Sequence, residues 1–328
     1  MIIGYVLNDN STVTQITINP EDGHTISNII WIDLFQPTPK EEKWVSTYYS
    51  IKIPSMKEMD KIEVLSPFYK EKDAHYMTAT TLEQARDHYC GGVALTFILT
   101  NSCLITLRYT ESSVLKNCAT YVIRHPELCA LPEVTLISIV DGLINSIAEV
   151  LERAGNELDS LLRTLFENPD DKRAQHSGRH NEIMRGTGRT GNLISKNRES
   201  LVSINRLLIY FSQIDKEYGG KNDAKLRLRH LSMEIYSLNE YANFLSQRNA
   251  FLLDAVLGMI QVEQNMIIKM LTVGAAAFMP PTLISSMYGM NFHNMPGLDW
   301  ELGYPLALLS IVISALVAYL IFKKKGWL

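Results

Sequence analysis

The stretch MLTVGAAAFMPPTLISSM, at residues 270–287, contains no charged side chain. A second uncharged run, GYPLALLSIVISALVAYLIF at residues 303–322, follows after a short connection. A helix needs about 20 predominantly apolar residues to cross a bilayer, and two such runs in tandem rarely belong to the buried hairpin of a soluble core. Together with Lys269 and the few residues before it, the first run is long enough. We therefore predict two membrane-spanning helices, over 266–287 and 303–322.

The residues that flank these runs predict their orientation. Lysines at 323–325 follow the second run and Lys269 precedes the first, whereas the connection 288–302 has no Lys or Arg. Lysine and arginine concentrate on the cytoplasmic side of spanning helices. We therefore expect both termini in the cytoplasm, with 288–302 outside and 323–328 as a basic cytoplasmic tail.

The composition of the whole chain excludes some classes of protein. Its 328 residues allow two or three domains, and the net charge of −4 argues against a dedicated nucleic-acid binder. The four cysteines, Cys90, Cys103, Cys118 and Cys129, form no CxxC pair, so we expect free thiols in a reducing compartment. The beginning of the chain, MIIGYVLNDN, lacks the basic and apolar segments of a secretory signal.

Residues 1–132 alternate short β-like runs with turn signals and predict a cytoplasmic α/β or α+β domain. A helix is expected to start after Thr38, which can cap it. Val93–Leu99 and Cys103–Tyr109 are predicted to form a hairpin. The other expected strands are Ile2–Leu7, Thr12–Ile18 and Ile29–Asp33.

Beyond residue 132, apolar residues recur at three- and four-residue steps and predict long helices over about 133–167, 181–216 and 223–287. The segment 133–265 is thus expected to be a cytoplasmic helical stalk. The last helix would continue without a break into the first span. So long a helix needs neighbours to bury its apolar stripe, which favours an oligomeric bundle.

Two motifs suggest chemistry that their context does not support. The sequence GTGRTG at 186–191 has the spacing of a dinucleotide fingerprint, but the polar segment before it is no strand, so glycines within a helix or a helical hairpin are the better interpretation. His176 and His180 have a metal-ligand spacing, but Gly178 lies between them and the segment has the character of a solvated turn. Because no catalytic or nucleotide motif appears, we expect no enzyme activity and no organic cofactor.

Polar side chains in and just before the first span share a helix face. Asn265, Thr272, Thr282 and Ser286 fall on the same side as Ile268, Ala275 and Met279. Such residues either join helices by hydrogen bonds or line a path for water and ions. The long helix favours the second interpretation. Pro280 and Pro281 remove two backbone donors and are expected to kink the helix or open it locally.

Several short motifs occur in order along the chain. They are YGMN at 288–291, MP at 295–296, GYP at 303–305, FKKKGWL at 322–328, EQN at 263–265, and WIDL at 31–34 followed by PTP at 37–39. With these motifs the sequence resembles the CorA magnesium-transporter family, most clearly over 245–328. The resemblance implies an α+β cytoplasmic domain, a long helical stalk and two C-terminal transmembrane helices, assembled as a funnel-shaped homopentamer.

The resemblance also implies a role for individual residues. It implies a channel for Mg²⁺, with Co²⁺ and Ni²⁺ as further substrates, in a bacterial inner membrane. Magnesium bound between cytoplasmic domains would close the pore, with Asp254 and Glu263 as candidate ligands. Gly289, Met290 and Asn291 would form the selectivity filter. The residues expected to line or gate the pore are Asn265, Ile268, Leu271, Thr272, Met279, Thr282 and Ser286.

Elementary chemistry explains an amide at the pore mouth. Magnesium gives up its waters reluctantly. A ring of Asn291 amides could hydrogen-bond the hydrated ion without the tight hold of carboxylates, and conduction requires that the ion leave again. Rings of Met279 and Leu271 would form an apolar constriction that gates by dewetting.

The connection departs from the family pattern at two positions. Gly297 and His293 stand where the family often has acids, so the loop should attract cations less strongly. Histidine rings could favour Zn²⁺, Ni²⁺ or Co²⁺, and transport of a transition metal is therefore an alternative. Met290 argues for Mg²⁺, because the zinc-transporting branch usually departs at that residue. A membrane sensor or scaffold without conduction is the third hypothesis.

Overall fold

The structure, a computed structural model, describes residues 1–8, 10, 12–20, 28–56, 58–59, 67–84, 90–166, 176–217, 222–290 and 300–327. The chain divides into two compact units, Met1–Leu252 and Leu253–Leu328. The first unit contains a sheet and long helices, and the second is helical. Helix α6 (Asn222–Tyr288) contributes to both units. The predicted α+β class with long helices and C-terminal apolar helices is confirmed.

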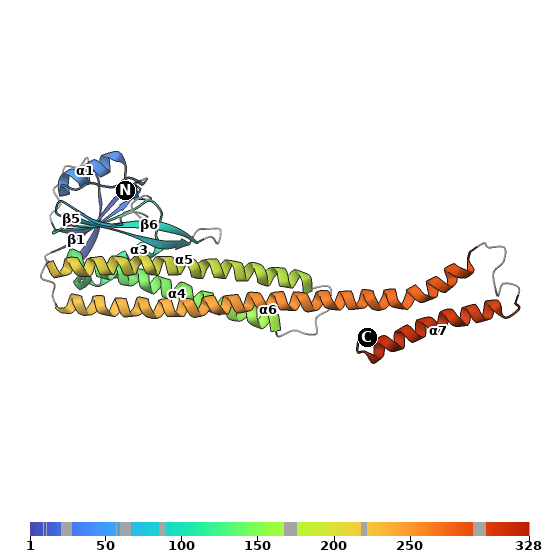
Figure 1. The fold of residues 1–328 in the computed structure, drawn as a ribbon. Helices are drawn as coiled ribbons and strands as arrows, with labels where there is room; N and C mark the ends of the chain where they lie inside the picture. The colour runs from blue at the N-terminus through green and yellow to red at the C-terminus, as the bar shows by residue number, and fades with distance from the viewer. Residues whose placement is uncertain are drawn as a thin grey trace. The chain divides into compact units, whose positions relative to one another are not determined.

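In the described residues, the first unit is built on one seven-stranded sheet with the order β2-β1-β3-β7-β6-β5-β4. Figure 1 shows this sheet against the long helices of the unit. Neighbouring strands are antiparallel except for β3 and β7, which are parallel. The predicted strands and the β6–β7 hairpin are confirmed, whereas β4 and β5 were not predicted. The strands are β1 (Ile2–Leu7), β2 (Val13–Ile18), β3 (Ile29–Phe35), β4 (Phe68–Glu71), β5 (Ala74–Gln84), β6 (Cys90–Leu99) and β7 (Leu104–Arg108).

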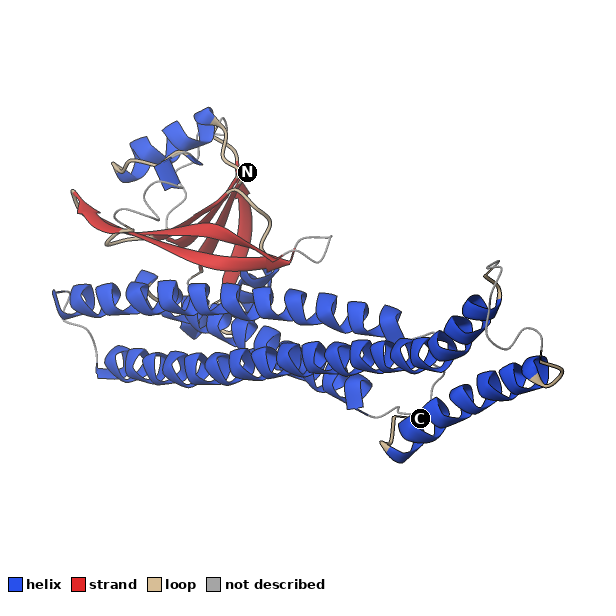
Figure 2. Cartoon of the chain, turned by 45° about the vertical axis from the view of Figure 1, so that its right-hand side comes forward, coloured by secondary structure: helices blue, strands red, loops and turns tan. Residues whose placement is uncertain are grey.

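Helix α1 (Pro39–Tyr49) begins where the sequence predicted a cap. The Thr38 hydroxyl accepts a hydrogen bond from the Glu41 amide, and the Glu41 carboxylate accepts one from the Thr38 amide at 2.7 Å. This capping box satisfies two amides that the first turn would leave unpaired. Figure 2 shows the sheet as a layer between α1 and the long helices of the unit. The core on the α1 side includes Ile32, Leu34, Val45, Tyr76 and Ile105.

The sheet is followed by α3 (Ser113–Arg124), the 3₁₀ turn Pro126–Cys129, α4 (Pro132–Phe166) and α5 (His176–Glu217). Helix α4 agrees with its prediction within one residue at each end, and α3 was not predicted. Helix α5 begins at His176, five residues before the predicted start. The segment around Gly178 is therefore helix and not the expected turn.

Glycines let the long helices of the first unit approach each other closely. A Cβ atom on Gly155 of α4 would lie 2.7 Å from the Tyr241 hydroxyl of α6, and one on Gly186 of α5 would lie 3.0 Å from Leu161 of α4. A Cβ on Gly191 would lie 2.7 Å from the Asn249 amide nitrogen of α6. Two glycines of the GTGRTG motif are thus packing residues inside a helix, as the interpretation against a nucleotide site predicted.

A buried ion pair joins the two parallel strands of the sheet. The Arg108 guanidinium on β7 donates to the Asp33 carboxylate on β3, with the shortest N–O distance at 2.8 Å. The Thr106 hydroxyl also donates to Asp33, at 2.9 Å, and accepts from the Trp31 indole at 3.0 Å. A charged pair buried in this way is retained because each charge has several hydrogen-bond partners.

Among the residues that the structure describes, three helices are apolar and long enough to cross a membrane by length and composition. They are α4, the Ala224–Tyr288 part of α6, and α7 (Gly303–Lys324). Half of the most apolar window of α4 is buried inside the chain, whereas the windows of α6 and α7 have no buried residue. Packing within the first unit therefore accounts for the apolar residues of α4, and the two predicted spans remain the candidates for contact with lipid.

Candidate ion pathway

The residues predicted to line a pore form one stripe along the second-unit part of α6. We call this set the α6 stripe, and every member is exposed. At 100° per residue the members fall within an arc of about 120°, and they extend over about 32 Å of helix. That length matches the hydrocarbon core of a bilayer, about 30 Å. The α6 stripe consists of Asn265, Ile268, Leu271, Thr272, Met279, Thr282 and Ser286.

The two threonines of the α6 stripe are held in the same way. The Thr272 hydroxyl donates to the Ile268 carbonyl at 2.8 Å, and the Thr282 hydroxyl donates to the Phe278 carbonyl at 2.7 Å. Each hydroxyl proton is therefore used within the helix. The remaining lone pairs of each oxygen are left to accept hydrogen bonds from outside, as a water-lined path requires.

Helix α6 continues through Pro280 and Pro281 to Tyr288. Figure 1 shows a bend in its last part. Proline removes a backbone donor and crowds the preceding turn, which is the usual origin of a bend. The bend agrees with the predicted kink, and the helix continues past the two prolines.

The predicted filter begins where α6 ends. The Gly289 amide still donates to the Ser285 carbonyl at 3.0 Å, and Met290 is exposed. A Cβ atom on Gly289 would lie 3.3 Å from the Ser285 carbonyl oxygen, so glycine fits this turn more easily than other residues. Asn291, His293 and Gly297 lie outside the described residues.

The two predicted metal ligands lie on different sides of α6. Asp254 is exposed and lies 18 residues, five full turns, before Thr272, so it shares the side of the α6 stripe. Glu263 lies nine residues before Thr272, about 180° around the helix, and is half-buried. The fold therefore aligns Asp254 with the stripe and separates Glu263 from it.

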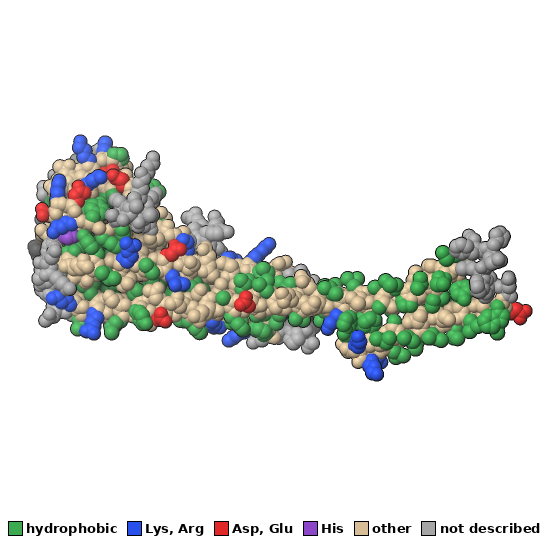
Figure 3. All heavy atoms as spheres, in the orientation of Figure 1, with side chains coloured by type: hydrophobic (Ala, Val, Ile, Leu, Met, Phe, Trp, Pro, Cys, Tyr) green, Lys and Arg blue, Asp and Glu red, His purple; other side chains and the backbone are tan. Residues whose placement is uncertain are grey.

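Helix α7 shows the pattern of a spanning helix with anchored ends. Tyr304 near its start and Trp327 after its end are exposed, as is Trp300 in the connection. In Figure 3, hydrophobic side chains are spread along the visible surface of the second unit, interspersed with backbone and other side chains. Lys323 and Lys324 close the helix, and the Lys323 ammonium lies 6.0 Å from the ring of Tyr319.

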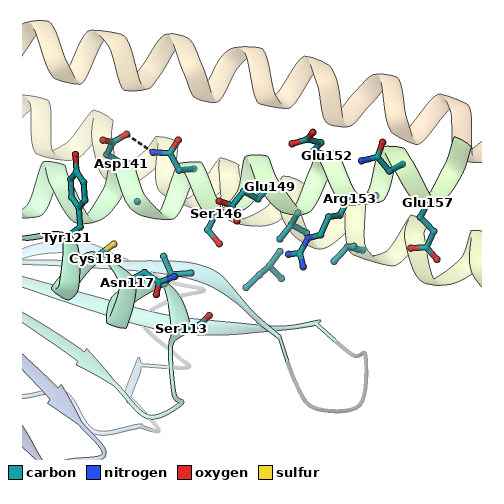
Figure 4. Close-up of a pocket in the computed structure, with 18 of the residues that line it drawn as sticks. Ser113, Asn117, Cys118, Tyr121, Asp141, Ser146, Glu149, Glu152, Arg153 and Glu157 are labelled. Atoms are coloured by element: carbon teal, nitrogen blue, oxygen red, sulfur yellow. Dashed lines mark hydrogen bonds between the residues drawn. The ribbon is translucent and has the colours of Figure 1, made fainter. Parts of the chain in front are cut away.

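A groove of about 1620 Å³ in the first unit was not predicted. It lies between α3, α4 and α5, and Figure 4 shows labelled side chains of α3 and α4 on its walls. The signal in the sequence was a polar stripe on α4 at steps of four, four, three and four, formed by Asp141, Asn145, Glu149, Glu152 and Asn156. The Asn145 amide donates to Asp141 at 3.2 Å.

The groove does not gather the ligands of a tightly bound metal. Among the described residues, no group of three or more His, Cys, Asp or Glu side chains could hold a metal ion. His176 and His180, which the sequence offered as a metal pair, belong to the first turns of α5, and the side chain of His176 lies outside the described part.

Comparisons with known proteins show what this chain is similar to. A family described as "CorA-like Mg2+ transporter protein" matches residues 27–324. The Magnesium transport protein CorA of Wolinella succinogenes is 30% identical over 313 residues, 93% of each chain. The protein of the same name from Escherichia coli K12 is 28% identical over 322 residues, 98% of each chain.

A solved structure shares the fold over the full length. The complete structure of the CorA magnesium transporter from Methanocaldococcus jannaschii matches with a TM-score of 0.76 at 17% identity, covering 100% of this chain and 99% of that one. At this identity the likeness shows the fold alone. The family match over 27–324 and the relative from Wolinella succinogenes decide the assignment, and the chain belongs to the CorA family.

Proposed function

We propose that this chain is the subunit of a magnesium channel that admits hydrated Mg²⁺ to the cytoplasm. The observation that carries the proposal is the α6 stripe, in which amide and hydroxyl oxygens alternate with apolar side chains on one exposed face of the helix. Membership of the CorA family supports magnesium as the substrate. It also accords with the expectation that the chain is not an enzyme.

The chemistry of the stripe suits an ion that keeps its water. Hydrated Mg²⁺ presents hydrogen-bond donors, and Thr272 and Thr282 have acceptor lone pairs because their protons are bound within the helix. The same neutral oxygens hold the ion loosely enough to release it. Gly289, Met290 and Asn291 would form the selectivity filter, with Asn291 at the mouth and Leu271 and Met279 as the constriction.

The membrane potential is sufficient to drive entry. Moving one charge through 100 mV changes its energy by about 2.3 kcal/mol, so a divalent ion gains about 4–5 kcal/mol. The lysines at 269 and 323–325 support an orientation with both termini in the cytoplasm, in a bacterial inner membrane. Co²⁺ and Ni²⁺ are proposed as further substrates.

A single chain cannot enclose a pore with one helix, so several copies must assemble. Large apolar side chains stand exposed on α6 within the first unit, and soluble surfaces rarely leave such residues uncovered. Copies of this helix packed around an axis would cover them. The number five follows the family resemblance. The exposed residues are Leu226, Met233, Tyr236, Phe244 and Phe251.

Regulation by cytoplasmic Mg²⁺ would act through acids that different subunits bring together. Asp254 lies on the side of the α6 stripe and is the first candidate. Glu263, on the opposite side of the helix, would have to act from another contact. Binding of Mg²⁺ to such acids would hold the subunits together and the pore closed.

The deciding experiment measures Mg²⁺ uptake by proteoliposomes that contain the purified chain. Wild type is compared with Asn291→Ala and with the matched control Asn294→Ala, in the presence of Zn²⁺, Co²⁺ or Ni²⁺ as competitors. We expect uptake that Asn291→Ala abolishes and Asn294→Ala retains. Zn²⁺ uptake without Mg²⁺ uptake would assign the chain to transition-metal transport. An assembled oligomer without any flux would instead indicate a sensor or scaffold.

A further inference from the structure

Helix α5 carries polar side chains at positions where a buried helix face is normally apolar. Its buried seam advances in alternating steps of four and three residues, and no member is more than 2% exposed. Such a seam is usually built from Leu, Ile and Val. Here the seam is Ile183, Thr187, Thr190, Ile194, Asn197, Leu201, Ile204 and Leu208.

Two of the polar members have an oxygen atom without a partner in the protein. The hydroxyl of Thr190 and the side-chain carbonyl oxygen of Asn197 are buried and make no hydrogen bond with any other group in the described part of the protein. The Asn197 amide nitrogen, in contrast, donates to the Leu193 carbonyl at 2.8 Å. Ser200, also 0% exposed, has an unpartnered hydroxyl as well.

The third polar member, Thr187, shows that a buried threonine on this seam can satisfy its hydroxyl within the helix. Thr187 is 2% exposed and Thr190 is 1% exposed. The Thr187 hydroxyl donates to the Ile183 carbonyl one turn earlier, at 2.8 Å. This bond is the usual way for a threonine to satisfy its hydroxyl inside a helix. Thr190 does not make it.

A buried polar oxygen without a partner costs free energy unless a water molecule supplies the bond. Thr190 also lines the groove between α3, α4 and α5, so solvent in the groove comes close to its buried hydroxyl. The partners on offer are neutral hydroxyl and amide oxygens, which suit water better than a bare cation. We infer that the helical core of the first unit binds water at two places on α5, one at Thr190 and one at Asn197 and Ser200.

The two places hold different water molecules. Thr190 and Asn197 are seven residues apart, which separates them by about 10 Å along the helix. A polar side chain of α6 lies near the proposed water site at Thr190. It is Asn249, which lies against Gly191 and whose side-chain carbonyl oxygen is also unpartnered. The second place lies deeper, because Asn197 does not line the groove.

The direct test is a high-resolution map of the full-length oligomer in detergent or nanodiscs. We expect ordered water within about 2.7–3.2 Å of the Thr190 hydroxyl and of the Asn197 carbonyl oxygen. A map of that quality without water at either oxygen, or with the Thr190 hydroxyl turned onto the Gly186 carbonyl, would overturn the inference. The map requires no substitution, so no folding defect can obscure the result.

A matched pair of substitutions tests the same inference in solution. Valine is similar in shape to threonine, so Thr187→Val and Thr190→Val each remove one hydroxyl from the same seam. Only Thr190→Val removes a proposed water ligand. We expect the thermal unfolding midpoint to fall more for Thr190→Val than for Thr187→Val. A rise for Thr190→Val would mean that its hydroxyl was dry and unpaired, because removing such a group stabilises the fold. That result would contradict bound water.

Discussion

The buried charges of Asp33 and Arg108 depend on each other at the scale of single residues. Both side chains are 5% exposed, and the pair sits on the one parallel pair of strands in the described sheet. The guanidinium also donates to the Thr110 carbonyl at 3.1 Å and lies 4.5 Å from the ring of Phe35. These contacts fix the register of β3 against β7, two strands that are far apart in the sequence.

The first prediction concerns removal of one charge of this pair. Arg108→Met leaves the Asp33 carboxylate buried without its counter-charge, which should lower the free energy of unfolding by about 3–5 kcal/mol. The double variant Asp33→Leu with Arg108→Met should recover most of that loss, because it leaves no unpaired charge. Chemical denaturation of the purified protein measures both. Equal losses in the single and double variants would argue against the charge as the cause.

The second prediction concerns the buried thiol of Cys103. Burial raises its pKa from 9.0 to about 12. Between these two pH values the unfolded chain loses the thiol proton and the folded chain keeps it, so the free energy of unfolding falls as the pH rises. Cys103→Ala removes this titration and should make the fall shallower by about 1.4 kcal/mol per pH unit. The free energy of unfolding of wild type and variant is measured by denaturation between pH 9 and pH 11. Equal slopes against pH would refute the prediction.

Helix α5 illustrates, at the scale of one element, how the same residue type plays different roles. Gly186 and Gly191 meet other helices, whereas a Cβ atom on Gly188 would find nothing within 4 Å. The difference follows from the side of the helix on which each glycine lies. In the motif with the spacing of a nucleotide site, Gly186 and Gly191 allow neighbouring helices to approach closely, and Gly188 between them is exposed.

The third prediction compares these glycines. Gly191→Ala puts a methyl group 2.7 Å from the Asn249 amide nitrogen, so α5 or Asn249 must shift and the unfolding midpoint should fall. Gly188→Ala adds a methyl group in open space and should stabilise α5 by about 0.5–1 kcal/mol, because alanine has the higher helix propensity. Thermal unfolding of the two variants decides. Stabilisation by both would mean that Asn249 moves away without cost.

In the proposed function, transport and its regulation belong to an assembly of several copies, because one α6 stripe would line only one side of a path. Each copy would contribute its Asn265, Thr272 and Thr282 to rings around an axis. The acids proposed to sense cytoplasmic Mg²⁺ would likewise act between copies. In such an assembly a change at one residue is repeated in every subunit.

The fourth prediction tests Asp254 as such an acid. Asp254→Asn should keep Mg²⁺ uptake high when the cytoplasmic face is bathed in millimolar Mg²⁺, because the closing site has lost a ligand in every subunit. Glu263→Gln, an acid on the other side of the same helix, should change the response less. Flux measured against the Mg²⁺ concentration on that face gives both curves. Identical curves for Asp254→Asn and wild type would remove Asp254 from the regulatory site.

The sequence by itself determined the features that depend on local pattern. Runs of apolar residues and their flanking lysines indicated the two C-terminal helices, and three- and four-residue spacing indicated α4, α5 and α6. The capping residue Thr38 marked the start of α1. These predictions succeeded because helix formation and helix length depend on residues close together in the chain.

The tertiary structure alone decided the features that depend on distant residues. The parallel pairing of β3 with β7, the Asp33–Arg108 pair, the groove beside α4 and the unpartnered oxygens of α5 all arise where separate elements meet. A single sequence gives the side of a helix on which a residue lies, but not what packs against that side. For this reason Gly186 and Gly191 acquired a role only from their neighbours.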